Sequence, residues 1–290
     1  MAEVVVAEPP RSSLVWRRER VALGTLTRAP LAIIGMVVIL AWIVIAIAWP
    51  VLVPYAPTEI HVDAALRPPS PNYFFGTDQL GRDIFSRVLA GSRDVLIVAP
   101  CATLIGLTLG TLLGLVAGYY GGLLDDIVMR AIDAVMAFPL IVLALLILAT
   151  FGPSLVSVIL VIGFVFAPHT ARVVRSVVLG LREMNFVAAA KLRGESNWYL
   201  LLAELLPNAR APIVVEGTVR IGYAIFASAT LSFLGLGVPP PASDWGLQVA
   251  DARNFLQTAP WMALFPSLAI ASLVVAVNLV ADGVRRALAD

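Results

Sequence analysis

The thirty residues from Ala29 to Thr58 contain no charged side chain, and this constrains the chain more than any other feature. A helix needs about 20 apolar residues to cross the hydrocarbon core of a bilayer. Charged residues make up only 13% of the sequence, against about 25% in an average soluble domain. The sequence therefore predicts an all-α integral membrane protein whose charges lie in the connections.

Six stretches are long and apolar enough to be membrane spans. We predict a cytoplasmic N-terminal segment, 1–30, followed by a single transmembrane domain, 31–290. The first apolar run is too long for a signal peptide. The predicted spans are 31–54, 95–118, 127–151, 154–174, 210–236 and 258–281.

Small residues recur every four positions in the second predicted span, a spacing that lets helix backbones approach closely. They are Gly106, Gly110, Gly114 and Gly118. We therefore expect this span inside the helix bundle. Three prolines within other spans are expected to kink their helices. They are Pro139, Pro168 and Pro266.

Arginine and lysine predict the orientation, because cytoplasmic connections carry an excess of both. With six spans, the N-terminal segment, the connection between spans four and five, and the C-terminal tail fall on one side. These segments hold most of the basic residues, so both termini are predicted to be cytoplasmic. The connections 56–93 and 237–257 then lie outside, and their prolines indicate ordered loops.

The basic connection 182–208 has a helix-turn-helix pattern. Good helix formers run from Phe186 to Leu192, and Gly194 suits the left-handed position that ends a helix. Ser196 or Asn197 can cap a second helix, Trp198 to Leu206. The pattern is compatible with an amphipathic connector resting on lipid headgroups. It is equally compatible with an element that docks into a partner protein, with Phe186 as apolar anchor.

Catalytic and nucleotide-binding motifs do not appear in the sequence. A P-loop needs Ser or Thr after its Lys, but the single lysine, Lys191, precedes Leu192. His61 and His169 fall on opposite sides of the predicted topology, so neither suggests a metal pair. The net charge is only +1, and the basic residues are not clustered on a soluble domain as nucleic-acid binding requires. We expect a chain without catalysis, metal or cofactor of its own.

Two groups of charges lie at the ends of predicted spans. Residues three or four apart share a helix face, which applies to Asp126, Arg130 and Asp133 and to the pair Glu216 and Arg220. The simpler interpretation is an interfacial cluster that holds helices together. The alternative is a gate or a contact to a partner.

Several motifs resemble the C-type permeases of bacterial dipeptide and oligopeptide ABC importers. Phe186 to Ala190, followed by Gly194 and by Leu206-Pro207-Asn208, resembles the cytoplasmic "EAA" loop of importer permeases. Phe75 to Asp83 resembles the segment before their second span. Leu231 to Val238, with further matches to Gly283, resembles their C-terminal third. The matches occur in the family's order and cover about residues 70–286.

The resemblance implies six transmembrane helices of the type I ABC importer permease kind, with a cytoplasmic coupling helix. It also implies a second, homologous permease, ABC ATPase subunits that bind ATP and Mg, and an extracytoplasmic binding protein, all at a bacterial inner membrane. The residues implied in ATPase coupling are Glu183, Phe186, Val187, Ala188, Ala189, Ala190, Arg193, Gly194 and Pro207. Asp126, Arg130, Asp133, Glu216 and Arg220 then become candidate interfacial or gate charges.

The chain departs from the family at two positions. Ala188 stands where the loop motif has Glu, and Ser228 stands where a Glu often precedes the Leu231 run. We therefore expect the loop to dock by shape and apolar contact. The substrate is a dipeptide or oligopeptide by resemblance, with nickel, an opine or another small solute as alternatives. A self-sufficient secondary transporter would need mid-span ionisable residues and internal repeats, which the sequence does not show.

Overall fold

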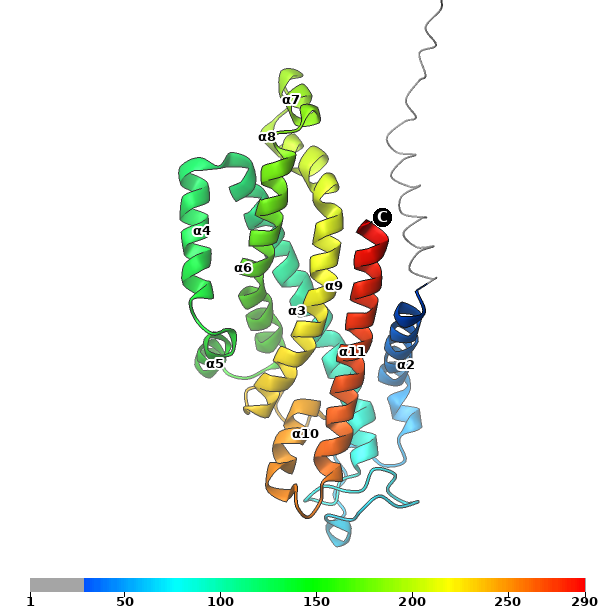
Figure 1. Ribbon diagram of the computed structural model, residues 1–290. Coiled ribbons are helices and arrows are strands. Elements are labelled where there is room, and N and C mark those ends of the chain that lie inside the picture. The colour runs from blue at the N-terminus through cyan, green and yellow to red at the C-terminus, as the bar shows by residue number, and fades with distance from the viewer. Residues whose placement is uncertain (1–28, 290) are drawn as a thin grey trace, which may run out of the picture.

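The computed structural model describes residues 29–289, so the predicted N-terminal segment 1–30 lies almost wholly outside the described residues. The regular elements of the described part are helices, and loops such as 53–83 join them (Figure 1). Its long helices are α2 (Pro30–Leu52), α3 (Ile84–Tyr120), α6 (Leu155–Leu181), α9 (Leu206–Phe233) and α11 (Trp261–Ala289). Its shorter elements are η1 (Val62–Ala64), α4 (Gly122–Met136), α5 (Leu140–Phe151), α7 (Asn185–Leu192), α8 (Asn197–Tyr199), η2 (Leu200–Leu205), α10 (Trp245–Ala252) and η3 (Arg253–Phe255).

The architecture confirms the predicted six-span fold. Within residues 29–289, five helices are long and apolar enough to cross a membrane, and α4 with α5 can form a sixth span as a bent pair. The helix α3 lies in the middle of the bundle and packs against α6 along most of its length. The α7 helix lies at one end of the molecule and α10 at the other (Figure 1).

The predicted third span, 127–151, is not one continuous helix. It consists of α4 and α5, which meet at an angle of 86°. The break falls at Ala137 and Phe138, directly before Pro139. A proline disfavours helical geometry in the residue before it and cannot donate a backbone hydrogen bond. Pro168 and Pro266, by contrast, lie inside α6 and α11.

The four glycines of α3 provide the close helix contact that their spacing predicts. All four are buried against α6. A Cβ on Gly110 would lie 2.5 Å from the Ala167 carbonyl oxygen, and one on Gly114 would lie 2.6 Å from that of Ala171. Because no side chain fits in these gaps, the backbones of α3 and α6 touch directly. This contact fixes α6, from which the α7 connection emerges.

Two predicted boundaries are wrong at the α7 connection. The span predicted as 154–174 continues to Leu181 in α6. The predicted helix Trp198–Leu206 does not end at Pro207, because α8, η2 and α9 form one helical segment from Asn197 to Phe233. The element η2 is a π-helix, and Pro207 follows it in the first turn of α9. The wider turn accommodates a residue that lacks an N–H, so the helix continues.

The two connections at the other end also differ from prediction. Helix α3 already begins at Ile84, where the Asp83 side chain accepts a hydrogen bond from the Ser86 N–H at 2.9 Å. The segment 237–257, predicted as a loop, contains α10. Asp244 caps α10 by accepting from the Leu247 N–H at 3.1 Å, and Trp245 is fully buried. The cap and the buried aromatic ring favour a helix after the three prolines, whose presence had predicted a loop for the whole segment.

Candidate functional site

The α7 helix is held on the bundle by one narrow face. Val187 and Ala190, three residues apart, are both 0% exposed. They pack into a small apolar cluster supplied by the ends of α3 and α6 and by η2. The other buried members of the cluster are Leu115, Val174, Val178, Leu200, Leu201 and Leu205. The spacing of the two inward residues matches one helix face. Phe186 and Lys191 make further contacts with the bundle, and Ala188, Ala189 and Leu192 are exposed.

A glycine turn reverses the chain after α7. Gly194 has a φ of +78°, as its predicted helix-ending position requires. The Glu195 N–H donates to the Ala190 carbonyl at 3.3 Å, and the Gly194 N–H donates to the Lys191 carbonyl at 3.0 Å. This pair of bonds is the Schellman arrangement that satisfies the last carbonyls of a helix. Ser196 then accepts from the Tyr199 N–H, which confirms it as the cap of α8.

Polar contacts attach the same loop to its neighbours. Arg193 lies 3.5 Å from Glu195 and 3.4 Å from Glu204 of η2. The Tyr119 hydroxyl, at the end of α3, donates to the Asn197 side-chain oxygen at 2.8 Å. Arg182 donates to the Gly118 carbonyl at 2.9 Å. These bonds are solvent-exposed or partly so, and each contributes little stability, but together they orient the loop.

The predicted coupling residues occupy three kinds of environment. Glu183, Ala188, Ala189, Arg193 and Gly194 are exposed, as is Pro207 at the start of α9. Phe186 is half-buried against the apolar cluster. Val187 and Ala190 point inward and act as the attachment of the helix.

Large exposed apolar side chains, which the sequence reading did not single out, surround the tip of this loop. Leu192 is 90% exposed, and Trp198 is 66% exposed. Met184, Tyr199 and Leu202 are also exposed. Once Val187 and Ala190 define the inner face, helical periodicity alone places Leu192 elsewhere on α7. We call Met184, Leu192, Trp198, Tyr199 and Leu202 the apolar tip.

Two acidic residues of α4 form ion pairs with α6 and not with Arg130 of their own helix. Asp133 forms an ion pair with Arg172 of α6, and Asp125 binds Arg175 of α6 through two bonds of 2.5 Å. Among the described residues, Asp126 and Arg130 form no ion pair. Sequence spacing identified neighbours on one helix, whereas the partners come from the adjacent helix. These two pairs fasten α4, which has few buried residues, to α6.

The second group of charges, the pair Glu216 and Arg220, is an ion pair in the structure. Glu216 and Arg220 of α9 form an ion pair at 2.6 Å, and both are mostly buried. The Arg220 guanidinium also lies 5.6 Å from the ring centres of Phe166 and Tyr223. Aromatic faces stabilise a cation that has lost much of its water. The pair is a polar element between α6 and α9.

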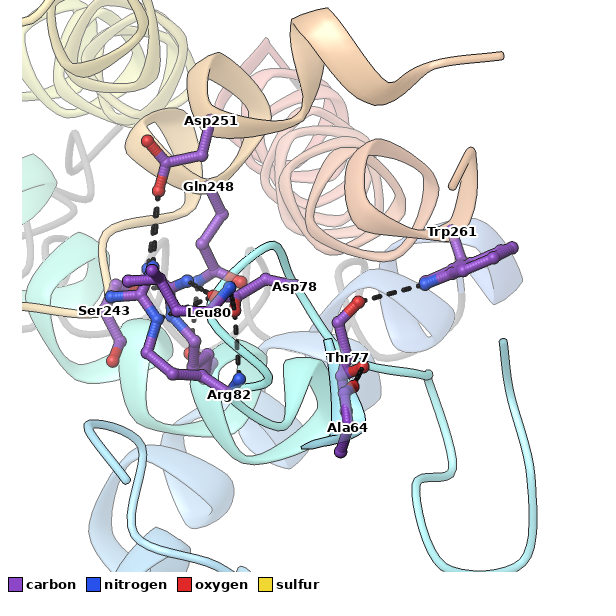
Figure 2. A network of polar contacts seen from close by, with 10 residues as sticks. Ala64, Thr77, Asp78, Leu80, Arg82, Ser243, Gln248, Asp251 and Trp261 are labelled. Carbon is purple, nitrogen blue, oxygen red and sulfur yellow. Dashed lines mark hydrogen bonds and ion pairs between the residues drawn. The ribbon is translucent and has the colours of Figure 1, made fainter. Parts of the chain in front are cut away.

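A buried charge network closes the opposite end of the molecule (Figure 2). Asp78 accepts from Arg82 Nε at 2.7 Å and also binds Arg87, and both Asp78 and Arg87 are buried. Asp251 of α10 lies 3.7 Å from Arg82 and 3.9 Å from Arg87. The network therefore joins the segment before α3 to α10. Trp261 of α11 adds a bond to the Thr77 carbonyl at 3.2 Å.

Two carboxyl groups at this end have raised pKa values. Burial raises the pKa of Asp244 from 3.8 to about 6, and the charge of nearby Asp94 contributes in the same direction. Burial also raises the pKa of Asp83, although hydrogen bonds from Ser86 and Phe85 oppose the rise. Both residues cap helices, so their protonation affects the stability of this end.

Two known families match parts of this sequence. Residues 110–290 match the family described as "Binding-protein-dependent transport system inner membrane component". Residues 14–69 match the "N-terminal TM domain of oligopeptide transport permease C".

Two relatives and one solved structure are similar over most of the chain. The chain is 43% identical to the dipeptide transport system permease protein DppC of Alkalihalophilus pseudofirmus, over 94% of this chain and 89% of that protein. It is 39% identical to DppC of Haemophilus influenzae, over 89% of each chain. A chain of the inward-facing MetNI methionine ABC transporter has the same fold, with a TM-score of 0.56 and 19% identity over 70% of this chain and 96% of that one.

The apolar helices and these matches make the protein a multi-pass protein of the inner membrane. The family match covers more than half of the chain and includes α4 through α11. The chain belongs to the family of binding-protein-dependent transport system inner membrane components.

Proposed function

We propose that this chain is one of two permease subunits of an ATP-driven peptide importer, and that α7 is its coupling helix. The observation that carries the proposal is the apolar tip, which stands on a helix anchored by Val187 and Ala190. A water-exposed apolar tip of this kind is a typical protein-contact surface. Peptides are the proposed substrates because the two relatives described above are named as dipeptide permeases.

The remaining parts of the transporter belong to other chains in this proposal. ABC ATPase subunits bind ATP and Mg and receive the apolar tip in a surface groove. A homologous second permease supplies the other half of the pathway, and an extracytoplasmic binding protein delivers the substrate. The α7 end is cytoplasmic, as are both termini, and the α10 end faces outward. The chain performs no catalysis and binds no nucleic acid.

Within the permease, α7 transmits movement in two ways. Its inner face contacts the ends of α3 and α6 through the apolar cluster. Its C-terminal turn leads through α8 and η2 directly into α9. Closure of the ATPase subunits on ATP would therefore act on three spans together. Alternating access requires such a two-state element that both sites influence.

Leu192→Asp tests the coupling role most directly. Leu192 is 90% exposed, so a charge there leaves the permease folded but disfavours an apolar contact. We expect ATPase subunits to be lost from the purified complex, and peptide-stimulated ATP hydrolysis to fall at least about ten-fold. Co-purification and steady-state hydrolysis measure the two effects.

Val62→Asp is the matched control. Val62 is 78% exposed at the α10 end, so it receives the same charge without affecting the α7 end. Its ATPase content should match that of the wild type. Retention of the ATPase and normal coupled hydrolysis by Leu192→Asp would refute the coupling role of the tip.

A further inference from the structure

An apolar groove of about 450 Å³ lies between α2, α3, α9 and α11. The α2 wall consists of Ile39, Ile43, Ala46 and Ile47. The lining is apolar apart from Arg93 and Thr218. Nothing in the coupling or polar contacts described above involves this groove.

Arg93 is the charged residue of the lining. It is exposed, and within residues 29–289 it forms no ion pair or hydrogen bond. The half-buried carboxyl group of its neighbour Asp94 interacts electrostatically with both Arg93 and Asp244, but it forms no hydrogen bond or ion pair with Arg93 among the described residues. An exposed guanidinium beside an apolar surface calls for a ligand that is apolar along its body and anionic at one end.

The groove is long enough along α2 to hold an extended hydrocarbon chain. Along α2 the lining runs from Ile39 to Ile47, which is about 12 Å at the helical rise per residue. A single hydrocarbon chain is much narrower than a helix and can lie along the groove.

The charge lies at one end of this groove. Arg93 lies two positions before the predicted apolar span 95–118, and α2 and α3 run in opposite directions (Figure 1). The deeper lining residues of α3 continue to Pro100. Arg93 is therefore near the depth at which lipid phosphates meet the hydrocarbon, and a long arginine side chain can reach toward that level.

We propose that this groove binds an anionic glycerophospholipid, with one acyl chain along α2 and its phosphate on Arg93. Guanidinium binds phosphate through two parallel charge-assisted hydrogen bonds. A zwitterionic headgroup carries its own cation beside the phosphate, so it competes less well for Arg93. The bound lipid would connect α2, which has only two buried residues, to the rest of the bundle.

Lipid retention by the purified complex tests this proposal. The complex is placed in nanodiscs containing phosphatidylglycerol and phosphatidylcholine with identical acyl chains, re-extracted, and its retained lipids are quantified by mass spectrometry. One basic contact predicts about five-fold enrichment of phosphatidylglycerol. Arg93→Gln should abolish the enrichment. Arg253→Gln, which changes an exposed arginine outside the groove, is the matched control and should retain it.

A second variant keeps the result interpretable if Arg93→Gln affects folding. Ala46→Trp fills the groove and leaves Arg93 in place, so it should release the bound lipid. Equal retention of both lipids by the wild type would overturn the proposal. So would unchanged enrichment in either groove variant. Cross-linking of an Ile43→Cys variant to a second permease, without lipid retention, would assign the groove to a protein contact and also overturn it.

Discussion

The two ends of the molecule are built on opposite principles. The α10 end encloses charge, because Asp78 and Arg87 are buried and Asp251 and Arg82 complete their network. The α7 end exposes apolar surface, because the apolar tip surrounds a helix that only Val187 and Ala190 attach fully. A buried charge network is costly to open, since each ion left alone keeps its desolvation penalty.

The contacts of the α10 end are formed within the chain, whereas the α7 end presents a surface that a partner can bind and release. The α10 end pairs the charges of its buried network with one another. The α7 end leaves apolar area in water, which a partner can bury and release during each cycle. The predictions below test whether the first end is rigid and the second is adaptable.

Asp78→Ala should have the largest effect on stability. It removes the acceptor of Arg82 and Arg87 and leaves the buried Arg87 with only Asp251 at 3.9 Å. Breaking a buried pair in this way costs about 3–5 kcal/mol. Thermal unfolding in nanodiscs measures the loss. Arg193→Gln removes two partly exposed ion pairs at the α7 end, with Glu195 and Glu204, and should cost less than about 1 kcal/mol. Similar losses in both variants would contradict the contrast between the two ends.

The α10 end should also become less stable as pH rises. In the folded state the pKa of Asp244 is about 6, above its ordinary value of 3.8. The folded state therefore holds the proton more tightly, and its advantage disappears as pH rises from about 4 through 6. The total loss in the free energy of unfolding, complete above pH 6, is about 3 kcal/mol. Roughly half of this loss develops between pH 5 and 7.5.

Asp244→Asn should reduce this pH dependence, because asparagine can still cap α10 and does not ionise. Melting temperatures at pH 5 and pH 7.5 provide the comparison. A slope remains in the variant because burial raises the pKa of Asp83 in the same direction. Identical slopes in the wild type and the variant would show that Asp244 does not titrate in this range.

Val187→Ala tests the attachment of α7. Val187 is fully buried in the apolar cluster, so shortening it should cost about 1–2 kcal/mol. Because the cluster also includes α3 and α6, we expect weaker coupled ATP hydrolysis with normal ATPase binding. Ala189→Gly, at an exposed position of the same helix, controls for helix propensity. Loss of ATPase binding in Val187→Ala would make Val187 part of the docking surface itself.

Gly194→Ala should have the smallest effect. Space is available for the added methyl group, since no atom lies within 4 Å of it. The cost comes from the φ of +78° and amounts to about 1 kcal/mol. The loss should appear as faster proteolysis or hydrogen exchange in α7, with little change in global melting. A change larger at the α10 end than at α7 would contradict this localised role.

The sequence predicted best those features that depend on the residues of a single helix or turn. Apolar length placed the six spans, glycine spacing placed the α3–α6 contact, and Gly194 and Ser196 marked the turn after α7. The family resemblance was confirmed because its motifs can be read from the order of residues along the chain, without knowledge of which helices meet. The bend at Pro139 was foreseen as a kink, but its angle depends on how α4 and α5 pack.

Contacts between distant segments could not be read in the same way. Asp125 and Asp133 pair with arginines of α6, about forty to fifty positions later in the chain. Arg87 and Asp251 are still farther apart. Helical periodicity states which residues share a face, but it does not state which helix that face meets. The outward direction of Leu192 likewise became clear only when the buried partners of Val187 and Ala190 were known.

The uninterrupted segment from Asn197 to Phe233 has a mechanical consequence. Its 37 residues form a rod about 55 Å long at the helical rise per residue. A tilt of only about 5° around one end of such a rod displaces the other end by about 5 Å, nearly one helical turn. At the far end, Gly246 of α10 lies against Ala229 of the rod so closely that a Cβ would be 2.2 Å from the Ala229 carbonyl oxygen. A tilt of this helical segment at the α7 end should therefore move α10 with it, because the contact between Gly246 and Ala229 leaves no space between them.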